Sequence, residues 1–314
     1  MQTYFSKIEV FAILLSGLCH DVKHPGLNNT YQVNAKTPLA MLYNDQSVLE
    51  HHHVATSFRI LSSAPTNILS GLTPDLYKTL RKIMVSTILA TDMTSHFSLI
   101  ESFNVFLESD AKTEFLATQR SELAENGDKK SALKLSHRFL IMEVLVHGAD
   151  ISNPCKNWKI SKRWSDLILE EFFCQGDLEK SQGLPISPNC NRESTDQAQF
   201  SLNFIDFIVS PMYVALNQFV SGMSISLSNL KANRTTWHDK VLDDITRDAK
   251  LSSDQKEEET QRWKRREASF LSIMLPEVLI EHIAEKEHSE ASSSRRNSLE
   301  VMRSSHVILC DIDA

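Results

Sequence analysis

Residues 8–26 read IEVFAILLSGLCHDVKHPG and join a strongly apolar run to a short cluster of histidines and an aspartate. The run from Ile8 to Cys19 is typical of a helix that is buried on most of its sides. Pro25 and Gly26 then stop the helix and turn the chain. The polar residues between the run and this turn are therefore expected to gather around one helix end.

The composition predicts an all-α, compact multi-helix fold. Only 8 glycines and 9 prolines occur in 314 residues, and so few turn formers favour long helices over many short strands. No run alternates as a strand does. Further helices are expected at Ser47–Leu61, Pro74–Leu89, Phe97–Phe115, Phe139–His147, Ser161–Phe173, Phe200–Leu227 and Asp254–Ile283.

Three of these helices carry local signals. Ser47 and Glu50 have the spacing of a capping box at the start of their helix. Pro74 lies in a first turn, where its missing N–H costs little. Pro211 is expected to kink the long apolar helix that contains it.

Bulk charge and cysteine content narrow the class of protein. A net charge of −7 disfavours a nucleic-acid polymer or an anionic membrane surface as the main partner. The five scattered cysteines include no CxxC pair, so a reduced, cytoplasmic protein is the simple interpretation. No run reaches the ~20 apolar residues of a spanning helix, and no basic leader precedes residues 10–19, so neither a transmembrane segment nor a signal peptide is predicted.

Two constellations combine metal-ligand residue types with a helix end. The first is HDVKHPG at residues 20–26, and the second is HGADISNP at residues 147–154, where Asp150 follows an apolar helix. Such N and O ligands suit zinc or another divalent cation, and a metal ion is one partner for a buried carboxylate. Taken singly, each is also explained by an aspartate that caps an ordinary helix end or turn.

Two more constellations lie between them. YNDQSVLEHHH at residues 43–53 places Glu50, His52 and His53 near one helix face, where they could orient metal ligands or be ordinary solvated surface. ATDMTSH at residues 90–96 gathers small polar groups at a helix junction, which an ordinary cap also explains.

Together and in this order, these motifs resemble the class I 3′,5′-cyclic-nucleotide phosphodiesterases. EEFFCQGD at residues 170–177, LPISPNC at 184–190 and FIDFIVSPMY at 204–213 extend the resemblance to roughly residues 5–285. It implies an all-helical catalytic domain of the His-Asp metal-dependent phosphohydrolase type. The implied reaction is hydrolysis of cAMP or cGMP, or both, to a nucleoside 5′-monophosphate in cyclic-nucleotide signalling.

The resemblance also implies roles for individual residues. His20, Asp21 and Asp150 match ligands of two divalent ions, Zn²⁺ and Mg²⁺ or Mn²⁺, with Asp21 as the bridge. The residues matched to the water shell of the second ion are His24, Glu50 and Thr91. Those matched to the purine pocket are Asn153, Ile168 and Phe204, and Ile168 and Phe204 would clamp the base between apolar faces.

Two departures from the family pattern stand out. No HNxxH occurs in the sequence, although that motif supplies the family's general acid and one zinc ligand. We therefore expect a domain without its N-terminal helices, and little turnover from this chain, because acid catalysis contributes ~10²–10⁴-fold. Ser201 stands where the family has its purine-reading glutamine; Gln197 and Gln199 are nearby but out of register.

These departures keep two functions open, an active hydrolase and an impaired or non-catalytic member that binds nucleotide or a partner protein. A third, another phosphohydrolase of the His-Asp type, is disfavoured by the match on the purine side. Residues 1–285 are expected to form the catalytic domain and 286–314 a disordered, Ser-rich tail. Within the tail, RRNS at residues 295–298 fits the pattern of cAMP-dependent protein kinase, with Ser298 as the phosphorylation candidate, although such short matches also arise by chance.

Overall fold

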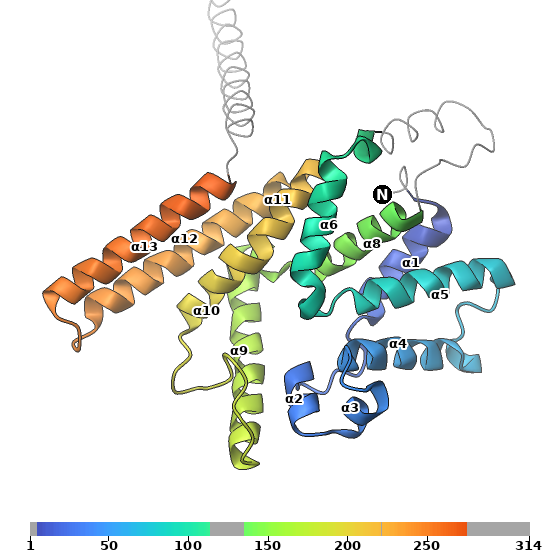
Figure 1. Cartoon of the computed structure of the whole chain (residues 1–314), viewed down its shortest axis with the longest axis horizontal. Helices are drawn as coiled ribbons and strands as arrows, with labels where there is room; N and C mark the ends of the chain where they lie inside the picture. The colour runs from blue at the N-terminus through green and yellow to red at the C-terminus, as the bar shows by residue number, and fades with distance from the viewer. Residues whose placement is uncertain (1–4, 114–134, 221, 275–314) are drawn as a thin grey trace, which may run out of the picture. The chain divides into compact units, whose positions relative to one another are not determined.

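The computed structural model describes residues 5–113, 135–220 and 222–274, and all regular elements in these ranges are helical (Figure 1). The main helices are α1 (Lys7–Cys19), α2 (Asn29–Asn34), α3 (Pro38–Tyr43), α4 (Val48–Leu61), α5 (Pro74–Leu89), α6 (His96–Glu108), α8 (Leu135–Asp150), α9 (Trp158–Ser181), α10 (Gln197–Asn203), α11 (Ser210–Phe219), α12 (Ser224–Arg247) and α13 (Ser253–Met274). Short 3₁₀ turns cover Ala64–Thr66, Met93–Ser95 and Asn153–Cys155. The predicted all-α class is confirmed.

The chain divides into two compact units, Met1–Asp244 and Ile245–Ala314. The first contains α1 to α11 and most of α12, and it carries every candidate site residue except Ser298. The second contains α13. The predicted boundary at residue 285, the tail and Ser298 lie outside the described residues.

Helix starts follow the local signals in one case and not in another. Helix α5 has the predicted bounds, with Pro74 in its first turn and the Thr73 hydroxyl accepting from the Leu76 N–H. The predicted capping box of α4 is wrong, because both of its side chains are taken by other partners. The Ser47 hydroxyl donates to Asp92 (2.7 Å), and the Glu50 carboxylate accepts from the side-chain amide of Asn29.

The long apolar helix predicted around Pro211 runs from Gln197 to Phe219 and contains a π-helical segment, Phe204–Val209, between α10 and α11. The Ser210 hydroxyl donates to the Ile205 carbonyl five residues earlier (2.7 Å). A proline ring clashes with the carbonyl four residues before it in a regular helix, and the wider π turn lies directly before Pro211. The distortion is therefore a widening of the helix, which ends eight residues earlier than predicted.

The run Gln197–Phe219 is also long and apolar enough to cross a membrane by length and composition, and half of its most apolar window is buried in the fold. The helical segments Pro74–Leu89 and Met93–Glu108 reach that standard only as a pair, bent by 80°. Since α11 packs against α6 and α8, the first run is a core helix of this domain.

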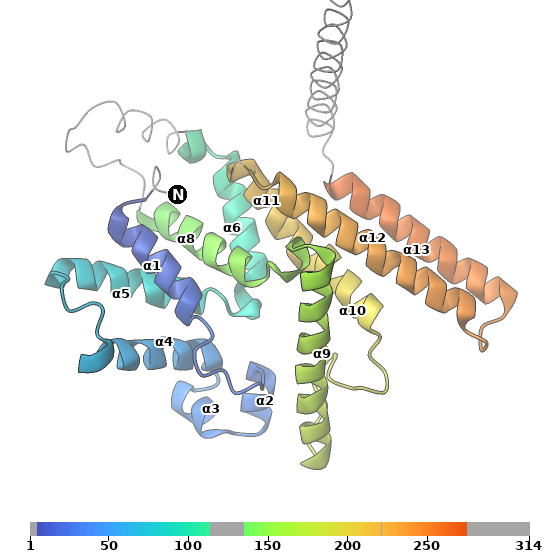
Figure 2. The same ribbon diagram turned by 180° about the vertical axis from the view of Figure 1, so that it is seen from behind.

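The core of the first unit forms where α1, α5 and α8 pack against one another (Figure 2). Its buried side chains include Ala12, Ile13 and Leu15 of α1, Leu80, Ile83, Met84 and Ile88 of α5, and Ile141, Met142 and Val144 of α8. A fully buried polar contact joins α5 to α1 in this core, where the Thr87 hydroxyl donates to that of Ser16 (2.8 Å). The packing brings together the ends of α1 and α8, which carry His20 and Asp150.

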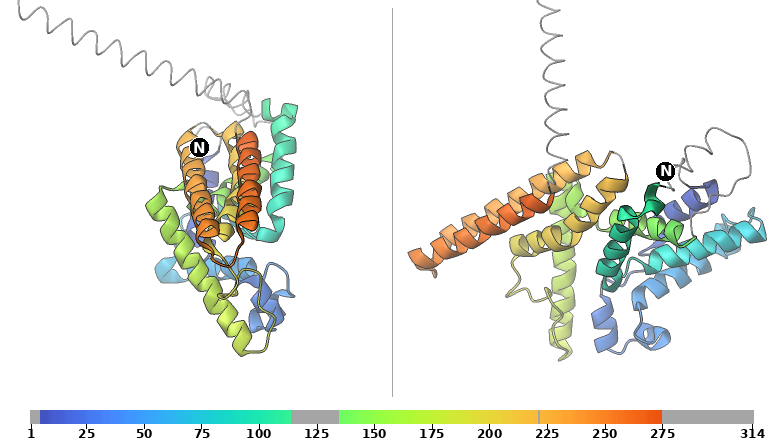
Figure 3. Two further views of the ribbon diagram at one scale, coloured as in Figure 1. Left: turned by 90° about the vertical axis from the view of Figure 1, so that its left-hand side faces the viewer. Right: turned by 45° about the horizontal axis from the view of Figure 1, so that its top comes forward.

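The loop after α9 runs back along that helix (Figures 1 and 3). The fully buried Glu179 carboxylate accepts from the backbone N–H and the hydroxyl of Ser187 (2.7 and 2.6 Å). Gly176 allows the close approach, because a Cβ there would lie 1.9 Å from the Cys190 carbonyl oxygen. This loop returns the chain to α10, which faces α9 across a hollow.

Candidate functional site

His20, Asp21 and Asp150 form a cluster of metal-ligand groups at the junction of α1 and α8. One ligand atom from each lies within 4.8 Å of the others. His20 Nε2 is 3.1 Å from Asp150 Oδ1 and 3.3 Å from Asp21 Oδ2. Three residues separated by up to 130 positions thus share one small volume, and the Asp21 side chain is exposed, so a cation can reach it from solvent.

The His20 ring is oriented by the backbone. Its Nδ1 donates to the Gly17 carbonyl (2.8 Å), which leaves Nε2 facing the two carboxylates. Without a metal, hydrogen bonds to Asp150 and Asp21 raise the pKa of His20 to about 11. A proton therefore occupies the position that a divalent cation fits, and the N/O/O donor set is one that such cations accept.

The sharp turn after α1 supplies the second side of the cluster. The helix ends at Cys19, and Lys23 adopts a left-handed backbone conformation, so the chain leaves regular helix at the metal-ligand pair itself. His53 donates from Nδ1 to the Val22 carbonyl (2.8 Å) and places Nε2 3.8 Å from Asp21 Oδ1. The His24 ring stacks on His53, with centroids 5.7 Å apart.

Glu50 occupies a polar environment of its own near the cluster. Both oxygens accept from Asn29 Nδ2 (3.2 and 2.9 Å), and Asn29 Oδ1 accepts from the Leu49 N–H. Burial is the largest cause of a raised pKa for Glu50, and the charges of Asp92 and Asp21 add to it. The buried Thr91 hydroxyl donates to the Ile88 carbonyl (2.8 Å), while Asp92 caps the following turn through the Thr94 N–H.

Two buried histidines connect the second and fourth constellations. His96 Nδ1 lies 2.8 Å from His147 Nε2, and neither residue is accessible to solvent. Burial, reinforced by the neighbouring His96, lowers the pKa of His147 to about 4. The pair is therefore neutral at ordinary pH and joins α6 to α8 one turn before Asp150.

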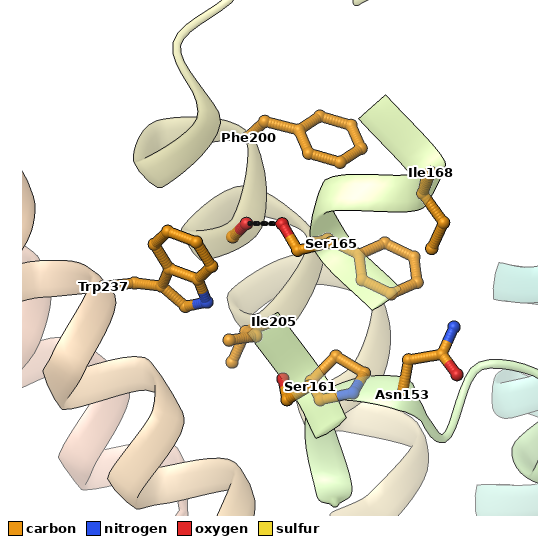
Figure 4. A pocket seen from close by; sticks show the side chains of 10 residues that line it. Asn153, Ser161, Ser165, Ile168, Phe200, Ile205 and Trp237 are labelled. Atoms are coloured by element: carbon orange, nitrogen blue, oxygen red, sulfur yellow. Dashed lines mark hydrogen bonds between the residues drawn. The ribbon is translucent and has the colours of Figure 1, made fainter. Parts of the chain in front are cut away.

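A separate hollow lies between α9, α10, the π-helical segment and α12 (Figure 4). It is lined by Asn153, Pro154, Ser161, Ser165, Ile168, Phe200, Ser201, Phe204, Ile205 and Trp237. Figure 4 shows the Trp237 indole at the left, facing Ser161 and Ser165, with Asn153 and Ile168 at the right. An apolar cavity with a few hydroxyl groups can hold a flat, partly polar ligand.

Buried polar side chains of α12 fix the segments that line the hollow. Asn233 of α12 donates from Nδ2 to the carbonyls of Pro154 and Lys156, both at 2.7 Å. Arg234, beside it, pairs with Asp206 of the π-helical segment (3.1 Å). Helix α12 thereby fixes both the 3₁₀ turn that carries Asn153 and the segment that carries Phe204.

Comparison with known proteins decides the family. The model of the 3′5′-cyclic nucleotide phosphodiesterase family matches residues 1–230. The chain belongs to this family. Among solved structures, the phosphodiesterase domain of the RhoPDE fusion protein from the choanoflagellate Salpingoeca rosetta is similar, with 31% identity and a TM-score of 0.65 over 75% of this chain and 70% of that one.

Curated relatives include phosphodiesterases of different specificity. The high affinity cGMP-specific 3′,5′-cyclic phosphodiesterase 9A of Pan troglodytes is 35% identical over 81% of this chain and 40% of its own length. The dual specificity calcium/calmodulin-dependent phosphodiesterase 1B of Cricetulus griseus is 36% identical over 85% of this chain and 48% of its own. The chain thus spans less than half the length of these relatives.

Within the phosphodiesterase fold, the predicted residues fall into two groups. The three predicted metal ligands meet at the cluster. His24 lies near it because its ring stacks on His53, and Glu50 lies near enough for the charge of Asp21 to help raise its pKa. All four predicted purine-pocket residues line the hollow, namely Asn153, Ile168, Ser201 and Phe204. Thr91 is buried beside Asp92, with its hydroxyl engaged by the backbone.

Some site residues were missed. Asn29 had no motif to mark it. Trp237 lies in a charged helix segment with no pattern that points to the pocket. Gln197 was set aside as out of register, yet its side chain contacts Ser165 in the hollow (3.1 Å). Its spacing of four from Ser201 is a signal, since residues i and i+4 share a helix face.

Proposed function

We propose that this domain hydrolyses 3′,5′-cyclic nucleotides, cAMP, cGMP or both, to nucleoside 5′-monophosphates. The observation that carries the proposal is the convergence of His20, Asp21 and Asp150 in a chain of this family. The hollow lined by Ile168 and Phe204 supports it, because an apolar clamp suits a purine base.

The donor set suits a divalent cation, and the family resemblance implies two such ions, Zn²⁺ together with Mg²⁺ or Mn²⁺. His20 would offer Nε2, and Asp21 and Asp150 would each offer one carboxylate oxygen; the family resemblance gives Asp21 the bridging role. When bound, such ions neutralise a phosphate and lower the pKa of water to near neutrality. Residues of the chain fix this arrangement, since the Gly17 carbonyl orients His20 and the Asn29 amide orients Glu50.

The family resemblance assigns His24, Glu50 and Thr91 to water around the second ion. Asn153, Ile168, Ser201 and Phe204 would hold the base. These residues support the metal-binding and base-binding parts of the reaction. The chain provides no HNxxH histidine to protonate the leaving O3′.

Hydrolysis assays of the 314-residue chain with cAMP and cGMP, in Mg²⁺ or Mn²⁺ with Zn²⁺, test the proposal. Any turnover should be abolished by Asp150→Ala, because the cluster loses a charged ligand. Asp75→Ala removes an exposed carboxylate of α5 outside the cluster and is the matched control. Turnover that survives in Asp150→Ala would contradict the metal role.

A second candidate, a nucleotide-binding module with little or no catalysis, is favoured by Ser201, which stands where the family resemblance places a glutamine that reads the purine. Calorimetric titration with cAMP and cGMP separates the two functions. Binding without turnover, lost when Phe204 is replaced by alanine, would support the module. Turnover sensitive to Asp150→Ala would support the hydrolase.

A further inference from the structure

A buried histidine of α4 contacts the turn that follows α1. The side chain of His53 is 2% exposed, and its Nδ1 donates to the Val22 carbonyl (2.8 Å), 31 residues earlier in the chain. A carbonyl group only accepts, so the proton of this bond lies on Nδ1. Because Val22 directly follows Asp21, the bond acts at the position where a metal-ligand residue leaves the helix.

The backbone of this turn needs support from outside. Lys23 has a φ of 59°, a left-handed conformation that is unfavourable for a residue with a side chain. The Val22 N–H donates to the Cys19 carbonyl (3.1 Å), and the His24 N–H donates to the Asp21 carbonyl (3.0 Å). Both of these bonds are local, whereas the bond from His53 ties the turn to another helix.

The same ring faces two residues of the candidate metal site. Its Nε2 lies 3.8 Å from Asp21 Oδ1, and it stacks on the His24 ring with centroids 5.7 Å apart and planes inclined by 25°. The Asp21 side chain is 63% exposed, so packing restrains it little. His53 therefore meets the turn at three points, on Asp21, on Val22 and on His24.

Helix α4 is a firm support for this ring. The Leu49 N–H, one turn before His53, donates to Asn29 Oδ1 (2.9 Å), and the Ser47 hydroxyl donates to Asp92 (2.7 Å). The Ser57 hydroxyl, one turn after it, donates to the His53 carbonyl (2.7 Å). A group that is held by a fixed helix keeps its partners in a defined geometry.

We propose that His53 is a positioning residue that fixes the turn of Asp21 and His24 in the arrangement that a divalent cation needs. The inference rests on the proposed function, which makes Asp21 a metal ligand. The essential contact is the bond from Nδ1 to Val22, because it sets the direction in which the chain carries Asp21 away from α1. Loss of a group behind a metal ligand typically weakens metal binding by about 10–100-fold.

Two substitutions of equal shape test the bond. His53→Asn keeps an N–H donor at the δ position, so the Kd for Zn²⁺ should stay within about 3-fold of the unchanged value. His53→Leu has the same size but no donor, so Zn²⁺ should bind about 10–100-fold more weakly. Calorimetric titration of the 314-residue chain with Zn²⁺ measures both. A purely structural role predicts no advantage for asparagine, since leucine suits a buried position at least as well.

His51 offers a matched control on the same helix. Its Nδ1 also bonds to a carbonyl, that of Ser47 (3.0 Å), but this bond lies within α4. Its ring stacks on Tyr43, which is not a residue of the candidate site. His51→Asn and His51→Leu should therefore leave the affinity for Zn²⁺ unchanged.

Co²⁺ in place of Zn²⁺ reports on ligand geometry separately from affinity. At saturation, the visible absorption bands should shift in His53→Leu and stay unchanged in His53→Asn. If His53→Leu does not melt cooperatively, His53→Phe replaces it, because phenylalanine keeps the ring without the donor and should behave in the same way.

The outcomes separate this role from the proposed function. Equal Zn²⁺ affinities and Co²⁺ spectra in the unchanged chain and in the variants without a donor would overturn the role of His53 alone. An equal loss in His53→Asn and His53→Leu would also overturn it. If the unchanged chain binds neither Zn²⁺ nor Co²⁺, the proposed function itself fails.

Discussion

The metal-ligand cluster and the hollow proposed to bind the base differ in how closely their residues follow the family pattern. At the cluster, His20, Asp21 and Asp150 agree with it and their ligand atoms meet within 4.8 Å. In the hollow, the resemblance matches Ile168 and Phe204 but places Ser201 where the family has a glutamine; Ser165 contacts Ser201, and Gln197 contacts Ser165.

The difference follows from the forces at the two places. Coordination of a metal ion needs specific ligand atoms at short distances and in a fixed geometry, so another residue type cannot replace a ligand without a large loss of metal affinity. A base pocket needs shape and a few hydrogen bonds, which different side chains can supply. Predictions that separate the two regions should therefore change metal binding and base binding independently.

The largest effect is expected at the cluster. Asp21→Asn keeps the shape of the side chain and removes the charge that faces His20. Zn²⁺ affinity should fall by about 100-fold or more, beyond the 10–100-fold typical of groups behind the ligands. Calorimetric titration with Zn²⁺ measures it, and binding of the uncharged nucleoside adenosine, which lacks a phosphate, should stay unchanged. An unchanged Zn²⁺ affinity would show that Asp21 is not a metal ligand.

A smaller effect is expected at Asn233, which supports one wall of the hollow. Asn233→Ala leaves the Pro154 and Lys156 carbonyls without their buried donor, which should lower the free energy of unfolding by about 2 kcal/mol. Urea unfolding measures it. The 3₁₀ turn of Asn153 should loosen, so adenosine should bind more weakly while Zn²⁺ affinity is kept. A variant that weakens both equally would show that the regions are not independent.

The smallest effect concerns pH. Folded His147 has a pKa of about 4, whereas an unfolded histidine takes up a proton below about 6.5. Its depressed pKa means that stability is complete above pH 6.5 and falls as the pH drops toward 4, by at most about 1.4 kcal/mol per pH unit. Urea unfolding across this range measures the loss. His147→Gln should show a shallower slope, and an identical slope would contradict a neutral buried ring.

Much of the fold could be predicted because its signals are local. Helix α5 has its predicted bounds, since Thr73 and Pro74 mark its start without help from the rest of the chain. The capping box of Ser47 failed because Asp92, 45 residues away, takes the hydroxyl. Tertiary partners of this kind leave no trace in local spacing.

Site residues could be predicted where they lie within a motif of the family. Asp150 and His20 were matched by sequence pattern, and their meeting across 130 residues is a property of the fold. Ser165 and Trp237 could not be found in this way, because they matter only as neighbours of Ser201. Gln197 could have been found from helical spacing.

The π-helical segment Phe204–Val209 determines where the chain can tolerate the deletion of a residue. Each residue advances an α-helix by about 100°, so removing one ordinarily rotates everything beyond it onto the wrong face. A π turn carries one residue more than the α turn it replaces. A one-residue deletion here can therefore be absorbed by tightening to regular helix, leaving the phase of both flanks intact.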